Sequence, residues 1–572
     1  MDQLLPYELM AAVCRRLAPC PCAPDSYQSV FSQSCTGHHA PGPFGRTALS
    51  ELRQTSRAWR AAALDTGLSQ IVASSRWMRG SGHDRLADIR ASHGRSVRRL
   101  VFRAADLFPG SGGAIATLEA ALALEWPCLD AIVIDWFSGS ADDQARIAAA
   151  VQHWAPRIRE LFVRDKHTSL AQVARLAGPS GCPRIRHLAA KPYGYDQRWD
   201  ALAPAERGAA SLLRFMPRQL MSLAVGGADF TPELLAALQV SQPCLARLSV
   251  EHAWALPALG ANDICLPAVT RLDLANVIVG DSLPVSARMF PQLRSLSVRD
   301  VWQSAPLRLA SARGAVSMQD PAWLGSFLAQ CWPHLRSLAL PAIADADATA
   351  LARACPALER LTTGSLDYAG PLLSAAGLVA TLRLPRLRYL AIEQRRADGT
   401  PGYHVADADV WRLLGLDDED AAFGRRMLRC TASNKSIGPP ALGGLARDLA
   451  TLCLPRAAFA PATLIALTAH LPNLVRLSVS LRAGSGLGPR NGSSNAVGFA
   501  AHTALRFIAI SADEDVLTDP RLSAWLVQRF PALQECSTNH ARSHRRMVSE
   551  LRSAAPAISF TRLSSRALQT CS

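Results

Sequence analysis

The sequence predicts an α/β solenoid, in which short parallel strands on one side alternate with helices on the other. One observation is a recurring stretch, Pro-x-Leu-x-x-Leu-x-aliphatic, which begins at Pro243, Pro291, Pro333, Pro385 and Pro472. A second is its spacing, because Pro243, Pro267 and Pro291 lie 24 residues apart. A third is the helical spacing of apolar residues before the prolines. Together they indicate one strand-and-helix unit that is repeated along the chain.

Each unit divides into a strand and a helix. In the segment LRSLSV, Leu296 and Val298 alternate with Ser295 and Ser297, which is the pattern of a strand with one buried face. The segment before Pro472 instead follows the helical spacing i, i+3, i+4, i+7, with Leu464, Leu467, Thr468 and Leu471. The proline ends the helix, because it disfavours the α conformation in the residue before it.

A period of 24 residues lies within the roughly 20 to 29 residues of leucine-rich repeats. We expect a horseshoe of such repeats over residues 71–560, with the strands on its concave face, the helices outside and a tail at 561–572. Loop insertions are expected at 299–322 and 393–444, where the spacing lengthens. The alternative is a doubly wound α/β enzyme, whose strands would be longer apolar runs with less regular spacing.

Composition agrees with a folded repeat protein in the cytoplasm or nucleus. The chain has 572 residues, of which 49% are hydrophobic, and a net charge of +15. Arginine supplies 58 of the 61 basic residues, and the charge is dispersed, so it does not indicate a nucleic-acid partner. No apolar run is long enough to span a bilayer, so no membrane partner is expected. Asp2 and Glu8 at the N-terminus do not fit a signal peptide, and we interpret the 14 cysteines as free thiols.

The segment 1–70 is predicted to form two short amphipathic helices separated by a loop. Leu5, Leu9, Val13 and Leu17 lie four residues apart, and Leu49, Leu52 and Trp59 lie on one side of a second helix. The linking residues 18–48 are rich in Pro, Ser, Gly and Cys. Two such helices cannot bury their own apolar sides and therefore need a partner.

This segment resembles the F-box family, whose two halves read Leu-Pro-x-Glu before one helix and a motif ending in Trp after another. The resemblance, and the repeats that follow, imply an F-box protein with ribonuclease-inhibitor-like repeats. It implies a surface for a Skp-type adaptor of a cullin ubiquitin ligase, formed by Leu5, Pro6, Glu8, Leu9, Val13, Leu17, Leu49, Leu52 and Trp59. The insertion 18–48 departs from the short link of the family. The alternative is that both helices only cover the open end of the solenoid.

The concave face is the predicted site for a protein substrate. The residues that flank the core leucines should line it, and we expect binding by Arg164, Arg247, Arg271, Ser295, Arg299, Arg360, Tyr389 and Arg476. Guanidinium groups on a rigid sheet suit an acidic or phosphorylated partner, since each can bind a carboxylate or phosphate with two hydrogen bonds. The alternative is that arginine is simply the usual polar residue of this chain.

No catalytic residue, metal ligand or cofactor site is predicted. The chain has no zinc-protease, nucleophile-elbow or kinase motif, and its Gly-rich stretches lack the P-loop Lys-Ser/Thr. The group Cys20, Cys22, Cys35, His38 and His39 does not match the spacing of a zinc finger. We therefore predict that the protein is not an enzyme but a substrate-recognition adaptor of a Skp/cullin/F-box ubiquitin ligase.

Two further functions remain open from the sequence. The first is a leucine-rich repeat scaffold for protein interactions with no role in ubiquitin transfer. The second is a GTPase-activating protein of the leucine-rich type, whose repeats usually carry Asn after the strand. Val277 and Val301 occupy that position here, which counts against the second function.

Overall fold

The computed structural model describes residues 70–74, 82–95, 97–103, 112–137, 141–165, 183–192, 216–226, 231–255, 264–279, 285–303, 322–364, 373–392, 447–459, 461–481, 501–512, 514–517, 520–538 and 559–562. The chain divides into two compact units, and the division passes through helix α12 (Pro232–Ser241). The first unit is formed by residues 1–228 and 236–245, and the second by residues 229–235 and 246–572. Each unit is described by itself.

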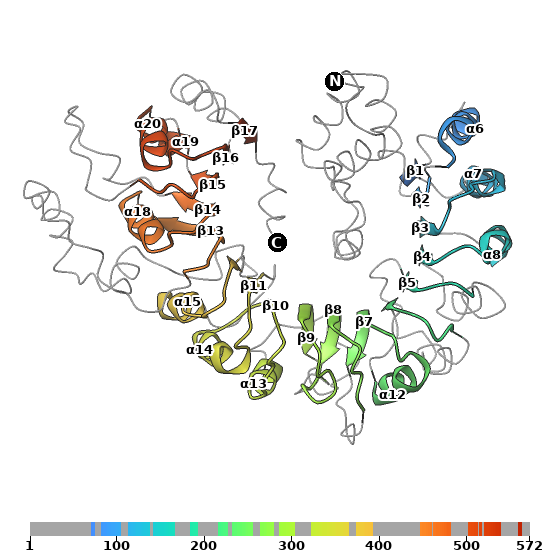
Figure 1. The fold of residues 1–572 in the computed structure, drawn as a ribbon, viewed down its shortest axis with the longest axis horizontal. Helices are drawn as coiled ribbons and strands as arrows, with labels where there is room; N and C mark the ends of the chain where they lie inside the picture. Colours follow the sequence, from blue (N-terminus) through green and yellow to red (C-terminus); the bar gives the residue numbers. More distant parts are fainter. Residues whose placement is uncertain are drawn as a thin grey trace, which may run out of the picture. The chain divides into compact units, whose positions relative to one another are not determined.

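In the first unit, parallel strands pair in chain order, each with the next. The strands are β1 (Gln70–Ser74), β2 (Arg99–Arg103), β3 (Ala131–Phe137), β4 (Glu160–Asp165), β5 (His187–Pro192) and β6 (Ser222–Gly226). One helix connects each pair of consecutive strands from β1 to β4. Figure 1 shows these helices as a layer on one side of the strands. They are α6 (Gly82–His93), α7 (Gly112–Ala123) and α8 (Ala141–Trp154).

The second unit has the same plan, with parallel strands in chain order and helices on one side (Figure 1). Its strands are β7 (Arg247–Ala255), β8 (Arg271–Val279), β9 (Ser295–Gln303), β10 (Ser337–Leu340), β11 (Arg360–Thr363), β12 (Tyr389–Ile392), β13 (Thr451–Phe459), β14 (Arg476–Leu481), β15 (Phe507–Ala512), β16 (Glu535–Thr538) and β17 (Ser559–Arg562). Its helices are α13 (Ala322–Leu328), α14 (Asp345–Ala354), α15 (Ala375–Leu382), α18 (Pro461–Ala469), α19 (Glu514–Leu517) and α20 (Pro520–Arg529).

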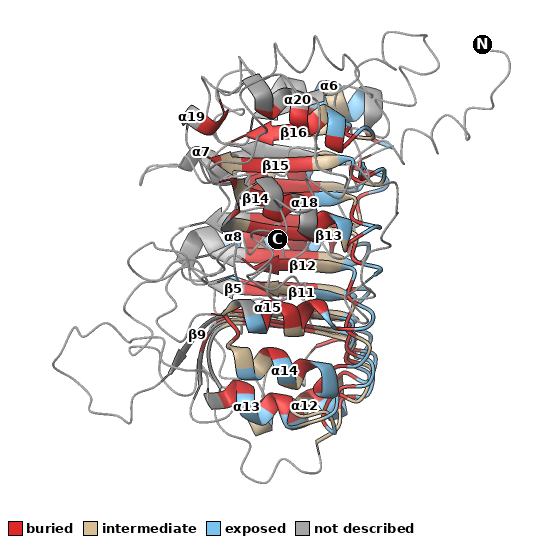
Figure 2. Ribbon diagram, turned by 90° about the vertical axis from the view of Figure 1, so that its left-hand side faces the viewer, coloured by how far each residue is buried: buried red, intermediate tan, exposed pale blue. Residues whose placement is uncertain are grey.

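The core of each unit lies between the strands and the helices. Successive strands align their leucines, so that Leu296 of β9 pairs with Leu272 of β8 and Leu338 of β10, and all three are buried. Burial alternates along β10 and β15, whereas β12, β14 and β16 are buried from their second residue to their fourth. Figure 2 shows buried strands with less buried first positions and exposed turn positions. The predicted α/β leucine-rich repeat solenoid is therefore confirmed.

The turn that precedes each strand is hydrogen-bonded to the turn of the previous repeat. The N–H groups of Arg294 and Ser295 donate to the carbonyl of Thr270 (2.8 and 3.0 Å), and that of Arg336 donates to the carbonyl of Arg294 (2.8 Å). The same ladder recurs in the first unit. Backbone pairing thus extends beyond the strands and fixes the turns relative to one another within each unit.

Some predicted boundaries differ from the structure by a few residues. β1 begins at Gln70 and β17 ends at Arg562, close to the predicted limits of 71–560. The predicted insertion at 299–322 overlaps β9, which continues to Gln303, because β9 pairs with the equally long β8. The insertion at 393–444, the residues 1–69 and the tail beyond Arg562 lie outside the described residues.

The residue before the recurring turn proline is a buried anchor in most described repeats. Trp126, Phe290, Trp332 and Phe530 fill this position, and the indole N–H of Trp126 donates to the carbonyl of Ala121 (2.8 Å). Gln242 takes the same position and is only 1% exposed. Within the described part of the chain, neither its amide nitrogen nor its amide oxygen has a hydrogen-bond partner.

We expect the substitution Gln242→Leu to stabilise the protein. A buried amide without a partner costs about 1 to 3 kcal/mol, and Leu fills a similar volume without that cost. The backbone hydrogen bonds of residue 242, to Leu238 and from Leu245, do not involve the side chain. The measurement is the urea midpoint of unfolding, with the exposed Gln239→Leu on the preceding helix α12 as control. A midpoint that falls, or that does not rise above the control, would contradict this account.

Helices α14 and α15 are joined by a side-chain clamp behind β11 and β12. The Asp345 carboxylate accepts hydrogen bonds from the Ser374 backbone N–H (2.8 Å) and from the Ser374 hydroxyl (2.5 Å). The same hydroxyl oxygen accepts the N–H of Ala376 and so caps α15. Gly377 leaves room for the clamp, because a Cβ there would lie 2.2 Å from an Asp345 oxygen and the carboxylate would have to shift. The clamp thus fixes α14 relative to α15, the two helices that pack behind β11 and β12.

Candidate functional site

The strand face of the second unit carries side chains from successive strands in register. We call the residue before the first core leucine of each strand the leading row. From β7 to β16 the leading row consists of Arg247, Arg271, Ser295, Ser337, Arg360, Tyr389, Thr451, Arg476, Phe507 and Glu535. Paired strands lie about 4.8 Å apart, so neighbours in this row are within contact distance.

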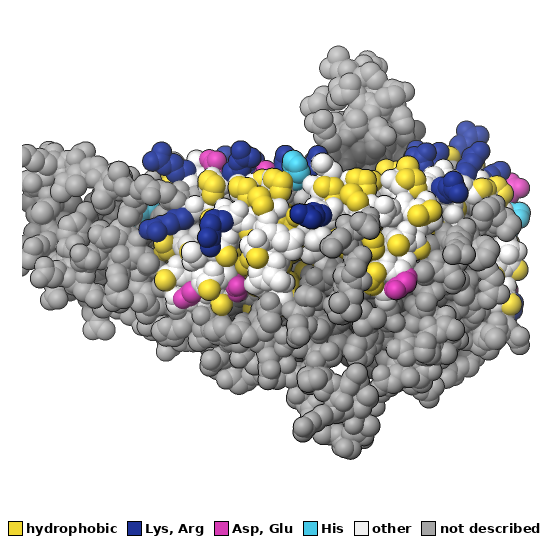
Figure 3. All heavy atoms as spheres, turned by 90° about the horizontal axis from the view of Figure 1, so that it is seen from below, with side chains coloured by type: hydrophobic (Ala, Val, Ile, Leu, Met, Phe, Trp, Pro, Cys, Tyr) yellow, Lys and Arg dark blue, Asp and Glu magenta, His cyan; other side chains and the backbone are white. Residues whose placement is uncertain are grey.

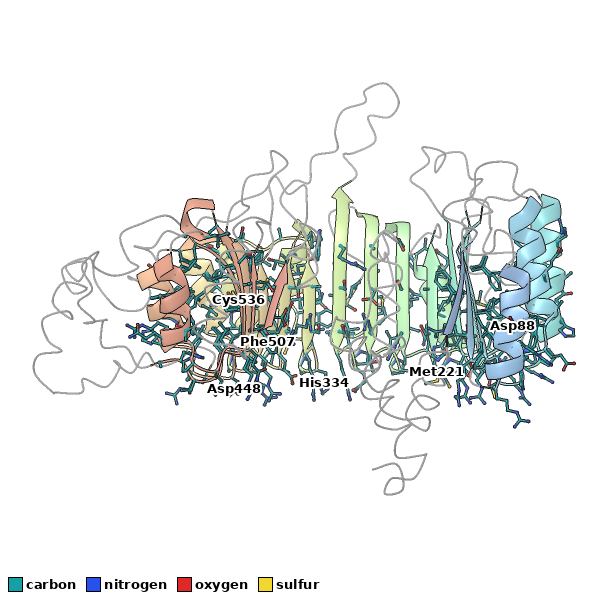
Figure 4. All side chains as sticks on the ribbon, turned by 90° about the horizontal axis from the view of Figure 1, so that it is seen from above. Asp88, Met221, His334, Asp448, Phe507 and Cys536 are labelled. Carbon is teal, nitrogen blue, oxygen red and sulfur yellow. The ribbon has the colours of Figure 1, made fainter. Side chains whose placement is uncertain are left out.

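Two arginines of the leading row lie over aromatic rings on the next strand. The guanidinium carbon of Arg360 is 3.8 Å from the ring centroid of Tyr389, and that of Arg476 is 4.6 Å from the centroid of Phe507. Figure 4 labels Phe507 on β15. Both arginines are exposed, whereas both rings are half-buried. A stacked guanidinium keeps its N–H groups in a fixed plane, where they can bind a carboxylate or phosphate of a partner.

A third arginine of the leading row is balanced by an acid on its own strand. The Nε of Arg271 lies 3.0 Å from Oδ2 of Asp273, which is two residues later and therefore on the same face. The Arg271 side chain is 16% exposed. Arg247 lies beside Arg271 on β7, and Ser295 lies on its other side on β9. The positive charge at β8 is thus partly neutralised within the site.

The next outward row, two residues after the leading row, differs between the units. We call it the central row. In the second unit its residues are small or polar: Ser249, Asp273, Ser297, Ala339, Thr362, Ala391, Cys453, Ser478, Ala509 and Ser537. In the first unit it is an apolar cluster of Val101, Val133, Phe162, Ala189 and Ala224. Small central residues leave the longer leading-row side chains of the second unit prominent on that face.

The strand face of the first unit offers fewer accessible groups. From β2 to β6 its leading row consists of Arg99, Ala131, Glu160, His187 and Ser222, none of which is exposed. In this row, Arg99 forms an ion pair with Glu160, two strands away. The central row is largely buried in both units, but the leading row of the second unit includes the exposed Arg360 and Arg476. The second unit is therefore the better candidate for partner binding on the strand face.

The predicted strand-face residues fall into three groups. Arg247, Arg271, Ser295, Arg360, Tyr389 and Arg476 all lie in the leading row of the second unit. Arg299 lies four residues further along β9, in register with Ala275, where it is half-buried. Arg164 is on β4 of the first unit, in register with Asp135 and Lys191, and its side chain is outside the described residues.

The structure brings together some of these residues but not all. Arg247, Arg271 and Ser295 lie on consecutive strands, as do Arg360 and Tyr389. Arg476 is separated from Tyr389 by Thr451 on β13. Sequence reasoning missed Phe507, although it takes the same place in LRFIAI as Tyr389 takes in LRYLAI. An alignment of the repeats by their leucines would have found it.

The predicted adaptor surface from Leu5 to Trp59 lies outside the described residues, and so does the Cys and His group of the loop 18–48. Among the residues that are described, no three His, Cys, Asp or Glu side chains lie close enough to hold a metal ion. None of the described helices combines the length and the apolar character needed to cross a membrane.

Comparison with known proteins gives structural likenesses only. No protein-family profile matches the chain, and no curated protein does. Similar solved structures include the leucine-rich repeat-containing protein LegL7 from Legionella pneumophila, at 15% identity and a TM-score of 0.29 over 51% of this chain and 90% of that one. Another is a complex of Rad7 and Elc1 in yeast, at 13% identity and a TM-score of 0.34 over 70% and 92%. A third is a complex of TLR13 with ssRNA13, at 13% identity and a TM-score of 0.32 over 72% and 56%.

The fold itself rests on the strands and repeats. Parallel strands follow one another in register. From β2 to β16 each carries a buried apolar residue, most often leucine, after its first position, and most are preceded by a hydrogen-bonded turn. The chain therefore has the α/β leucine-rich repeat solenoid fold.

Proposed function

We propose that the protein is a non-catalytic binding scaffold that holds a protein partner on the leading row of its second unit. The observation that supports this most directly is the pair of stacked arginines, Arg360 on Tyr389 and Arg476 on Phe507. Their exposed N–H groups are held in place before a partner arrives, which lowers the entropic cost of binding. An acidic or phosphorylated segment fits this arrangement.

We propose further that the scaffold is the substrate-recognition subunit of a Skp/cullin/F-box ubiquitin ligase. The support is the resemblance of segment 1–70 to the F-box family, with Leu5-Pro6, Glu8 and Trp59 at the matching positions. In this role the protein performs no chemistry. It raises the effective concentration of a bound substrate beside the ligase, and other subunits transfer ubiquitin.

One co-purification experiment tests both parts of this proposal. The wild-type chain is expected to recover a Skp-type adaptor together with further proteins. The triple variant Leu5→Ala, Pro6→Ala, Trp59→Ala should lose the adaptor, because it removes apolar contacts of the predicted surface. The row variant Arg360→Ala, Arg476→Ala should keep the adaptor and lose the further proteins.

The controls separate a lost contact from a damaged chain. Pro41→Ala, Pro43→Ala, Phe44→Ala makes three similar changes in the loop 18–48 and should recover everything that the wild type recovers. If the wild type recovers no adaptor, the ubiquitin role is wrong and the scaffold without it stands. If the row variant recovers the same proteins as the wild type, partner binding on the leading row is wrong.

A further inference from the structure

The turns of the first unit carry a dense group of arginines that the proposed function does not use. Two of these turns read Pro-Arg-Ile-Arg, at 156–159 and 183–186, and the third reads Pro-Arg-Gln-Leu, at 217–220. We call Arg157, Arg159, Arg184, Arg186 and Arg218 the rim cluster. All five are exposed, and the three turns contain no acidic residue.

The rim cluster sits on a rigid base. Ile158 and Ile185 are fully buried, so the arginines on either side of each must point away from the core. The N–H of Arg159 donates to the carbonyl of Asp130 (2.7 Å), that of Arg186 to the carbonyl of Arg159 (2.8 Å), and that of Met221 to the carbonyl of Arg186 (2.8 Å). The Gln219 amide also donates to the carbonyl of Pro183. Successive turns are therefore adjacent and fixed, with arginines about 4.8 Å apart from one turn to the next.

Few acids oppose this charge. Asp130 lies in the preceding turn between Arg98 and Arg159, and burial together with Glu160 raises the pKa of its carboxyl group, while those arginines act in the opposite direction. Among the described residues, none of the rim-cluster arginines forms an ion pair with an acid, and the guanidinium carbon of Arg157 lies 5.9 Å from the ring centroid of Trp154. Figure 3 shows Lys and Arg side chains gathered along one edge of the visible surface with few acids among them, and Met221, labelled in Figure 4, marks the turn edge in the first unit.

The rim cluster is distinct from the leading row. The leading row faces outward from the strands of the second unit, whereas the rim cluster lies on the turns before β4, β5 and β6 of the first. From the sequence alone, these arginines are predicted to lie next to the strands. The sequence does not show that they gather on the turns, apart from the strand face. They are separated in the chain by up to 61 residues and meet only because the repeats stack.

We infer that the rim cluster is a second binding surface, which takes an extended acidic segment of a partner protein, rich in Asp and Glu. Each guanidinium presents a planar pair of donors that matches a carboxylate. Three turns span only about 10 Å from first to last, which suits a few residues of an extended chain at about 3.4 Å each. A single-stranded nucleic acid fits less well, because the described turns of this unit expose no aromatic ring on which bases could stack.

The test is a binding assay with the full-length chain. The probe is a fluorescein-labelled peptide of alternating Glu and Ser, followed by fluorescence anisotropy at low salt. Replacing Arg157, Arg159, Arg184 and Arg186 together by Gln should weaken binding by about tenfold or more, because four charge-assisted contacts are lost. The interaction should also weaken as salt is added.

The matched control removes the same number of exposed arginines from equivalent turns of the second unit, where they are dispersed. Arg294→Gln, Arg386→Gln, Arg388→Gln, Arg506→Gln should change the affinity by less than about twofold. Both variants should keep the wild-type melting temperature, since the substituted side chains are exposed. Equal losses in the two variants would overturn the inference, because they would reflect net charge alone.

Two further outcomes also decide against it. If the wild type does not bind the Glu-Ser peptide more tightly than a Gln-Ser peptide, the rim cluster is not a surface for acidic segments. If a labelled oligothymidine binds more tightly than the peptide and depends on the same four arginines, the surface takes nucleic acid instead. The leading-row variant Arg360→Ala, Arg476→Ala separates the two surfaces, because it leaves the rim cluster intact and should bind the peptide like the wild type. A peptide that loses affinity in that variant and not in the rim variant would overturn this inference while the proposed function stands.

Discussion

The substitution Trp332→Ala is expected to destabilise the second unit by about 3 to 5 kcal/mol, the usual cost of removing a buried aromatic side chain. Trp332 is 2% exposed and stacks on Phe327, with ring centroids 4.7 Å apart. Its indole N–H donates to the carbonyl of Phe327 (3.1 Å), and its backbone N–H donates to the carbonyl of Ala354 (2.7 Å). The side chain therefore joins α13 to the turn that leads into β10.

The measurement is urea-induced unfolding followed by far-ultraviolet circular dichroism, which does not depend on tryptophan emission. Trp332→Phe keeps much of the volume but loses the indole hydrogen bond, so it should cost less than the alanine variant. His334→Ala, an exposed position two residues away in the same turn, should change stability by less than about 0.5 kcal/mol. A Trp332→Ala variant as stable as His334→Ala would show that this repeat does not depend on its anchor.

Stability is expected to fall steeply at alkaline pH because of two buried thiols in the second unit. Burial, with a smaller contribution from Cys331, raises the pKa of Cys355 to about 12. Burial, with a smaller contribution from Glu535, raises the pKa of Cys536 to about 12. In the unfolded chain both thiols have the usual cysteine pKa of about 8.5. The folded state therefore binds these protons more tightly than the unfolded chain. The contribution of the two thiols to the free energy of unfolding is complete below about pH 8.5 and is lost as the pH rises toward 12.

Each thiol should lower the free energy of unfolding by about 1.4 kcal/mol per pH unit in this window. Together they predict a loss of about 4 kcal/mol between about pH 9 and pH 10.5. The measurement is the urea midpoint as a function of pH. Cys355→Ala, Cys536→Ala should show a flatter profile over this range, whereas the exposed Cys128→Ala should keep the wild-type slope. Identical slopes in all three chains would mean that other groups control the alkaline transition.

Much of the fold could be predicted from the sequence because each repeat shows the apolar spacing of its own strand and helix. The alternation of Leu296 and Val298 with Ser295 and Ser297 predicts the two sides of β9. Leu296 and Val298 are buried as predicted, but Ser297 on the outward side is buried as well, at 7% exposure. A period of 24 residues then aligns the strands, so membership of the leading row follows from counting.

Features that depend on neighbours in space were harder to predict from the sequence. The length of β9 depends on its pairing with β8, so the strand continues to Gln303 within the segment 299–322 that is predicted as an insertion. The ion pair of Arg271 with Asp273 and the stack of Arg476 on Phe507 depend on side-chain conformation as well as on register. The rim cluster was hidden by the abundance of arginine, because composition cannot show which arginines meet.

The separation of the buried core residues from the leading row has a consequence for how this protein can change. Stability depends on the buried residues of the strands, while the proposed recognition surface is the leading row, and the two sets share no residue. New partners can therefore be acquired by replacing outward residues one repeat at a time, without repacking the interior. A library that varies Ser295, Ser337, Arg360, Thr451 and Arg476 at once should yield folded variants at high frequency, which makes the second unit a practical starting point for designing binders to short acidic sequences.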